Sequence, residues 1–277
     1  MIFASLPPLS TFEFNLVDNV FSMTVATMGA AAIFFFFGRT LVAPKFRPAL
    51  LVSGIVVAVA CYHYFMIRQS WQGAYAFGSD AFTATGKGFN DFYRYADWII
   101  TVPLLMVELV AVMSLTQAES RSLLVKLVIA AALMIGLGYP GEVSQNWQSV
   151  VLWGVLSSLP FLYILYVLWV ELGKAIDSQP DAVKTLLSVC RWVILITWAF
   201  YPIAYAIRGD SLPGAMPGLI PEKSGLGVVG TQIGYAIADI TAKAGFGLLI
   251  FFIARAKTDS MSDAERAEQM KLAAVTA

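Results

Sequence analysis

A lysine and two aspartates lie inside apolar stretches of this sequence, where ionisable side chains are rare. Lys243 follows Asp239 by four residues in the run YAIADITAKAGFGLL, so a helix places both side chains on one face. Asp97 lies in a second apolar run, RYADWIITVPLLMVEL. An ammonium in such surroundings needs anions beside it, and desolvated lysines are the residues that form Schiff bases with carbonyl compounds. The three residues therefore indicate a reactive amine held between two carboxylates.

The second run carries further polar groups at helical spacing. Thr101 follows Asp97 by one turn, and Glu108 follows it by close to three whole turns, so the three residues share one helix face. The two carboxyl groups then lie roughly 16 Å apart along the axis, about half the hydrocarbon thickness of a bilayer. Arg94 adds a second buried cation, so the charges of the two cations, Lys243 and Arg94, are balanced by those of the two aspartates. Carboxyl groups spaced in this way along a membrane bundle suit a proton relay.

Other residues lie where they can tune or line such a site. His63, the only histidine, falls at roughly the level of Asp97 in its own apolar run, and a histidine beside a carboxylate can modulate its proton affinity. In the run RWVILITWAFYPIAY, a helix places Trp198, Tyr201 and Pro202 on about one face, suited to a long apolar ligand beside a kink. Each residue alone has a simpler explanation in packing. A mid-membrane lysine at the depth of two aspartates does not.

The elements that position these residues are predicted by hydropathy. Seven apolar runs reach the length of about 20 residues that a bilayer requires. They lie near 14–37, 48–68, 90–113, 123–139, 149–172, 187–207 and 227–254. With 58% hydrophobic and 13% charged residues, the chain has too little polar surface for a soluble globule of 277 residues. We therefore expect an all-α membrane protein, with a seven-transmembrane-helix bundle over 1–256 and a charged cytoplasmic tail over 257–277.

Composition also argues against two kinds of site. The net charge of zero gives no basic field for nucleic acid, so no nucleic-acid partner is expected. The two cysteines lack the spacing of a disulfide framework or of a zinc site, and no metal site is expected.

The distribution of Lys and Arg predicts the orientation, because cytoplasmic connectors carry an excess of both. One set of connectors and the tail hold Arg39, Lys45, Arg47, Arg121, Lys126, Lys174, Lys184, Arg191, Arg255, Lys257, Arg266 and Lys271. The opposite set holds only Arg68, Lys87, Arg208 and Lys223. This bias places the N-terminus outside and the C-terminus in the cytoplasm. Asp97 then lies toward the extracellular side and Glu108 toward the cytoplasm.

Several motifs carry a family resemblance that spans residues 12–256. The runs RYADWIITVPLLMVEL, WAFYPIAY, YILYVLWVEL, ACYHYF and DITAKAGFGLL resemble those of microbial rhodopsins, specifically the bacterial proteorhodopsin and xanthorhodopsin group of light-driven outward proton pumps. The resemblance implies an ion transporter rather than an enzyme, a multi-pass protein of the bacterial inner membrane that forms homo-oligomers. It also implies all-trans retinal bound covalently to Lys243 as a protonated Schiff base.

The resemblance implies a role for each buried polar residue. Asp97 and Asp239 form the counterion, and Asp97 accepts the Schiff-base proton after light isomerises retinal. Glu108 is the cytoplasmic proton donor, Arg94 gates release to the outside, and His63 hydrogen-bonds Asp97. The positions that match the retinal pocket are Trp98, Thr101, Leu105, Gly154, Ser157, Phe161, Trp198, Tyr201 and Pro202.

Two positions distinguish groups within the family. Leu105 is the residue type of green-absorbing members, in which glutamine accompanies blue absorption. Gly154 stands where haloarchaeal pumps have tryptophan, as in carotenoid-binding xanthorhodopsin relatives, and would open a window for a hydroxylated carotenoid antenna. Close helix packing is the competing explanation for this glycine.

Two other function classes remain as alternatives. A sensory rhodopsin that signals through a transducer is the first, and Glu108 argues against it because sensory relatives usually lack that carboxyl group. A seven-helix receptor for a soluble ligand is the second, and it would require neither Lys243 nor its carboxylate partners.

Overall fold

A computed structural model of the protein describes residues 6–90, 92–113, 115–144, 146–177, 179–207 and 225–276. The long helices are α1 (Thr11–Gly38), α2 (Arg47–Ala74), α3 (Phe92–Val112), α4 (Gln117–Glu142), α5 (Trp147–Tyr166), α7 (Asp181–Ile207), α8 (Gly225–Asp239) and α9 (Phe246–Asp259). Two π-helical turns, η3 (Val167–Glu171) and η4 (Ile240–Gly245), continue α5 into α6 (Leu172–Asp177) and join α8 to α9. Short turns η1 (Arg39–Leu41) and η2 (Pro44–Phe46) link α1 to α2, and α10 (Asp263–Thr276) follows α9.

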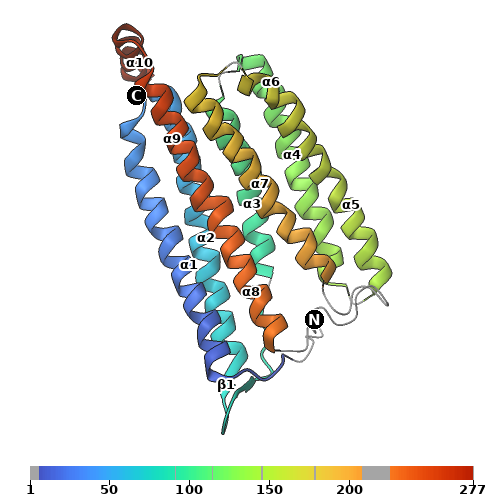
Figure 1. Ribbon diagram of the computed structural model, residues 1–277. Helices are drawn as coiled ribbons and strands as arrows, with labels where there is room; N and C mark the ends of the chain where they lie inside the picture. The colour runs from blue at the N-terminus through green and yellow to red at the C-terminus, as the bar shows by residue number, and fades with distance from the viewer. Residues whose placement is uncertain are drawn as a thin grey trace.

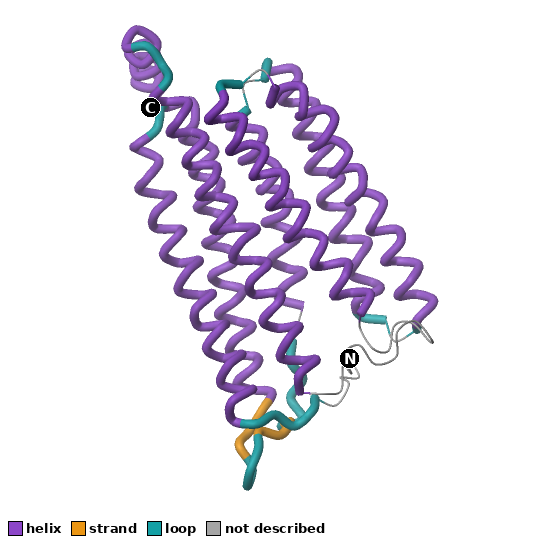
Figure 2. The backbone as a smooth tube through the Cα atoms, viewed as in Figure 1, coloured by secondary structure: helices purple, strands orange, loops and turns teal. Residues whose placement is uncertain are grey.

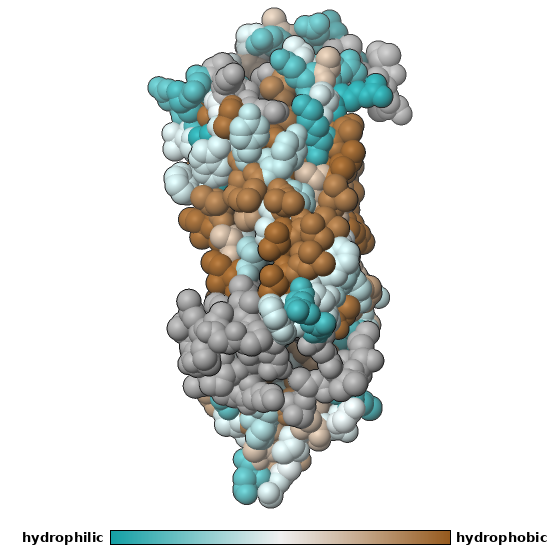
Figure 3. All heavy atoms as spheres, turned by 90° about the vertical axis from the view of Figure 1, so that its right-hand side faces the viewer, coloured by the Kyte–Doolittle hydropathy of each residue, from teal (hydrophilic) through white to brown (hydrophobic). Residues whose placement is uncertain are grey.

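In the described part of the chain, seven helical stretches are long and apolar enough to cross a membrane, which confirms the number predicted from hydropathy. They lie side by side in one bundle, and the beginning of α1 and the end of α9 lie at its opposite ends (Figure 1). Hydrophobic side chains gather over the middle of the face seen in Figure 3, and hydrophilic ones gather at its upper end. Large apolar side chains such as Phe37 and Ile196 are exposed, as expected when lipid is the solvent.

Local sequence explains where several helices begin and end. Ser10 and Thr116 each form a capping box with the glutamate three residues later, and these boxes start α1 and α4. The second span continues to Ala74, beyond the predicted end at residue 68. Trp71 explains the extension, because it is fully buried and stacks on Phe14.

A small β-hairpin lies between α2 and α3, where only an irregular connector was predicted. Strand β1 (Tyr75–Phe77) pairs antiparallel with β2 (Phe82–Ala84), and both strands lie at one end of the bundle (Figure 2). Leu9 adds two backbone hydrogen bonds of 2.9 and 2.8 Å to Phe82, and Phe14 stacks on the same ring at 3.9 Å. We call this end of the bundle the hairpin end, and the opposite end, where α10 lies, the tail end.

Candidate functional site

Lys243 lies at the centre of the bundle, in the π-helical turn η4. The side chain is only 2% exposed. Its Nζ forms ion pairs with Oδ2 of Asp97 and with Oδ1 of Asp239, the latter at 3.0 Å. The structure therefore brings together Lys243, Asp97 and Asp239, as predicted from the sequence. The sequence did not reveal the π turn, a feature that is common at functional sites.

Asp239 is held by donors from three other helices. Tyr64 of α2 and Tyr201 of α7 donate hydrogen bonds of 2.7 and 2.6 Å to its carboxylate. The indole Nε1 of Trp98, on α3, donates a third at 3.3 Å. These bonds fix the orientation of the carboxylate toward Lys243. Tyr64 was missed in the sequence, although it directly follows His63 in the ACYHYF motif.

Asp97 is less fully bonded than Asp239. Its Oδ1 has no hydrogen-bond partner among the described residues, and the Nδ1 of His63 lies 3.8 Å away. That nitrogen lies 3.0 Å from the carbonyl of Val59, to which it can donate. The expected hydrogen bond between His63 and Asp97 is thus not formed in this arrangement, since 3.8 Å is too long. Asp97 keeps an acceptor oxygen free beside His63.

Arg94 lies one turn from Asp97, toward the hairpin end. The guanidinium donates a hydrogen bond to Oε1 of Gln232 and lies 4.8 Å from the ring centroid of Tyr235. Both partners belong to α8 and were not identified in the sequence. Gln232 is a polar residue in an apolar run, next to Thr231, and polar residues inside apolar runs are the signal that marked the other buried groups.

Glu108 lies toward the tail end of α3 and is fully buried. Ser53 of α2 donates a hydrogen bond to its Oε2, and its Oε1 has no partner among the described residues. The position of Glu108 on the face that carries Asp97 agrees with the predicted helical spacing. Ser53 was missed, because a single serine in the run LVSGIVV does not by itself indicate a partner.

A cavity of about 460 Å³ extends from Lys243 and Asp239 between α3, α4, α5 and α7. Its volume is within the range of about 300–1,000 Å³ that is usual for small-ligand pockets. The predicted pocket residues that line it are Trp98, Leu105, Gly154, Ser157, Phe161, Trp198, Tyr201 and Pro202. Thr101 was also predicted but is not among the described residues that line the cavity. Its hydroxyl instead donates a hydrogen bond of 2.9 Å to the backbone carbonyl of Asp97.

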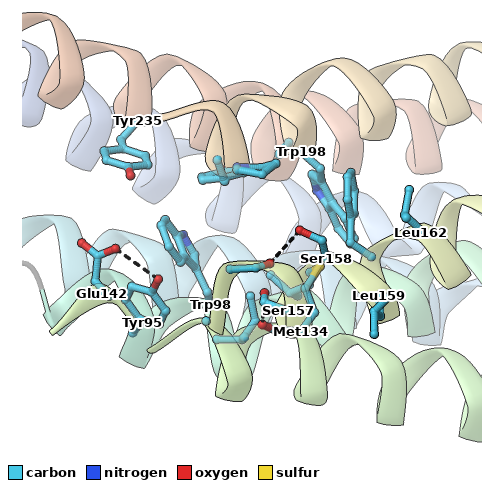
Figure 4. Close-up of a pocket in the computed structure, with 18 of the residues that line it drawn as sticks. Tyr95, Trp98, Met134, Glu142, Ser157, Ser158, Leu159, Leu162, Trp198 and Tyr235 are labelled. Atoms are coloured by element: carbon cyan, nitrogen blue, oxygen red, sulfur yellow. Dashed lines mark hydrogen bonds between the residues drawn. The ribbon is translucent and has the colours of Figure 1, made fainter. Parts of the chain in front are cut away.

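Part of the cavity wall was not predicted. Figure 4 shows Tyr95 and Glu142 at one end of the cavity and Leu159 and Leu162 at the other, with Trp98 and Trp198 nearer the middle. Gly138 of α4 also lines it, where a Cβ atom would lie 3.3 Å from the Ser157 hydroxyl. The small or apolar residues among them, such as Gly138, Leu159 and Leu162, carry no sequence signal of a binding role.

These features define a class of protein: a seven-helix membrane protein with a lysine that is buried between two carboxylates and lines a mainly apolar cavity. Residues 15–257 match the family of bacteriorhodopsin-like proteins. The chain belongs to this family and is a type 1 microbial rhodopsin.

Several solved structures and curated proteins are similar over most of the chain. The crystallographic structure of xanthorhodopsin, described as a light-driven ion pump with dual chromophore, is 50% identical, with a TM-score of 0.84 over 92% of this chain and 98% of that one. A thermophilic rhodopsin is 49% identical, with a TM-score of 0.85 over 91% and 98%. The green-light absorbing proteorhodopsin of a gamma-proteobacterium is 30% identical over 84% of both chains.

Family membership establishes a multi-pass bacterial membrane protein and, at the level of the family, a light-driven proton pump. It also implies retinal bound to a lysine through a Schiff base. The cavity fits that group, because its wall is mainly apolar and a buried lysine is among the residues that line it.

Proposed function

We propose that the protein is a light-driven outward proton pump that carries all-trans retinal on Lys243. The observation that carries this proposal is the position of the Lys243 Nζ between Asp97 and Asp239, with Lys243 in the wall of the cavity. Lys243 supplies the amine that condenses with the aldehyde of retinal, with release of one water. When bound, retinal supplies light absorption and an isomerisation that changes the surroundings of the lysine nitrogen.

Each of the buried polar residues then has one role in the movement of a proton. Asp97 accepts the proton from the nitrogen of Lys243, because the two are in direct contact and one oxygen of Asp97 has no hydrogen bond from the described residues. Asp239 remains the fixed anion, since three side chains besides Lys243 donate to it. Glu108 returns a proton to Lys243 from the tail end. Arg94 stands on the path from Asp97 toward the hairpin end.

The direction of transport follows from the proposed orientation. The predicted excess of Lys and Arg in the connectors at the tail end places that end in the cytoplasm. Protons accepted by Asp97 then leave at the hairpin end, outside the cell. The N-terminus lies outside in this arrangement, because α1 begins at the hairpin end.

Illumination of cells that express the protein with retinal tests this function directly. We expect the external medium to become acidic in the light, and a protonophore to remove the change. A sensory rhodopsin would instead show a photocycle without a pH change, and alkalinisation would reverse the proposed direction.

Glu108→Gln is expected to leave the colour nearly intact and to slow recovery of the photocycle by about a hundredfold, the scale of a lost proton donor. The colour persists because Glu108 lies roughly 16 Å along α3 from Asp97. Flash spectroscopy measures the recovery, and the rate in the variant should rise as the pH falls, since the proton must come from solution. Glu268→Gln, on the exposed surface of α10, is the control. Recovery at the native rate in Glu108→Gln would exclude the donor role.

Leu105→Gln is expected to shift the absorption maximum to shorter wavelength. Leu105 lines the cavity and is nearly fully buried, so a glutamine there places an amide dipole beside the polyene. Visible spectra of the two purified proteins measure the shift. Leu109→Gln, a buried change on the same helix outside the described cavity wall, is the control. An unchanged maximum in Leu105→Gln would show that this residue does not contact retinal.

We further propose a hydroxylated carotenoid antenna beside Gly154. Gly154 lines the cavity on α5, next to the exposed residue Val155. A rigid polyene can lie against this apolar surface and bury area near the retinal site. The similarity to xanthorhodopsin, described as having a dual chromophore, supports the proposal.

Gly154→Trp is expected to abolish carotenoid binding, because an indole fills the space that glycine leaves open. Candidate carotenoids are added to both purified proteins, and the action spectrum of pumping is recorded. A carotenoid band in the action spectrum of the native protein that is absent from Gly154→Trp supports the antenna. If no carotenoid binds, or if energy transfer survives the substitution, Gly154 is a packing residue.

A further inference from the structure

The cavity that Lys243 lines also reaches the surface that faces lipid. Lys243 is 2% exposed, whereas Val155 and Leu159 of α5 are 57% and 58% exposed, and all three residues line the same cavity. Leu162, one turn after Leu159, is also exposed and lines it. The cavity therefore connects the buried amine with the hydrocarbon side of α5.

The helix beside this opening is loosely covered by the rest of the protein. Only 17% of the most apolar stretch of the fifth span is buried, against 61% for the seventh. Pro160 interrupts the backbone hydrogen bonds of α5, and Pro202 does the same in α7 across the cavity. The hydroxyl of Ser158 bonds to the carbonyl of Gly154 at 2.8 Å, a contact that often bends helices. This wall is the part of the site best able to move aside.

The hairpin side of Lys243 is obstructed by buried ionic groups. Asp97 and Arg94 are 1% and 2% exposed and lie between the lysine and that end. An apolar molecule entering there would have to separate Arg94 from Gln232 and leave desolvated polar groups unpaired. The α5 side presents instead apolar residues such as Leu159 and Val155.

We propose that retinal enters from the lipid through this opening, which we call the α5 portal and which Val155, Leu159 and Leu162 define. The inference rests on the proposed attachment of retinal to Lys243. A polyene aldehyde partitions into the bilayer, so the α5 portal receives it from the phase in which it is concentrated. The aldehyde end passes along the cavity to the amine, where a C=N bond forms and the oxygen leaves as water. Gly154 keeps the cavity wall free of a side chain beside the α5 portal.

The rate of colour formation tests the α5 portal. The full-length protein is produced without retinal and placed in phospholipid nanodiscs, all-trans retinal is added, and growth of the visible band is followed. Leu159→Trp places an indole at the α5 portal and is expected to slow the growth of the visible band by at least about tenfold. Leu152→Trp is the matched control, because Leu152 is a similarly exposed leucine of α5 outside the described cavity wall. It should form colour at the native rate.

A second supply of retinal separates a blocked route from a damaged site. When retinal is present during synthesis, it can bind before the bundle closes, so Leu159→Trp should then form pigment although it forms colour slowly on later addition. Slow colour only on later addition supports the α5 portal. Equal rates in native protein and Leu159→Trp, or equal slowing in Leu152→Trp, would overturn it while leaving attachment at Lys243 intact.

Two remaining outcomes are also decisive. If Leu159→Trp fails to form pigment by either supply, Leu162→Trp is measured in the same way and its rate decides. If the native protein forms no visible band, the proposed attachment fails and the α5 portal fails with it.

Discussion

Lys243→Ala is expected to yield a folded protein without any visible absorption band. The amine of Lys243 is the group that lies between Asp97 and Asp239 at the cavity, and alanine has no nitrogen that can condense with an aldehyde. Spectra of the purified variant after addition of retinal measure the result. Circular dichroism shows whether the helices remain.

Lys257→Ala is the matched control for this experiment. Lys257 is also a buried lysine of the last span, but its Nζ donates to the backbone carbonyl of Val112 at 2.7 Å, at the tail end of α3. Its removal should leave the visible band in place. A visible band that persists in Lys243→Ala would overturn the assignment of the attachment site. If the band is at the same time lost in Lys257→Ala, the attachment site is Lys257.

Hydropathy was sufficient to predict the seven spans because lipid imposes a single requirement on every crossing helix. It could not predict the ends of these helices, which depend on tertiary contacts. Ala74 ends α2 six residues beyond the predicted boundary because Trp71 packs on Phe14, a residue distant in the sequence. The hairpin of β1 and β2 was missed for a similar reason. Leu9, which precedes α1 in the sequence, completes the pairing with backbone hydrogen bonds to Phe82.

The ionic part of the site was more predictable than its wall. Lys243, Asp97, Asp239 and Glu108 stand out because charge inside an apolar run is costly and therefore rare. Their uncharged partners gave weaker signals. Ser53 donates to Glu108 from another helix, and such a contact depends on how the helices pack.

The family resemblance implied a hydrogen bond between His63 and Asp97, whereas the depth of His63 along its helix predicted only that it lies near this carboxylate. Both residues lie at the predicted level, but the imidazole Nδ1 lies 3.0 Å from the carbonyl of Val59, one turn earlier in the same helix. Helical spacing places a residue along the axis and around it. It does not predict whether the ring nitrogen donates its hydrogen bond to the Val59 carbonyl or to the Asp97 carboxylate.

Asp97→Asn is expected to reduce light-driven transport by at least about a hundredfold, the lower range for loss of a positioned proton acceptor. An amide has nearly the shape of the carboxylate but cannot take the proton from Lys243. The colour should remain, because Asp239 still balances the charge and keeps its bonds from Tyr64 and Tyr201. Light-induced pH changes in vesicles measure transport, and visible spectra measure the retained pigment.

Asp97→Glu separates loss of the acceptor from loss of structure. It restores a carboxyl group with one more methylene, and it should recover part of the transport that Asp97→Asn loses. Asn keeps nearly the native shape and Glu is larger by one methylene, so a packing defect would affect Asp97→Glu more, whereas a missing acceptor affects only Asp97→Asn. If Asp97→Asn transports protons at the native rate, Asp97 is not the acceptor. Asp239, the other carboxylate in contact with Lys243, would then have to take the proton despite its three other donors.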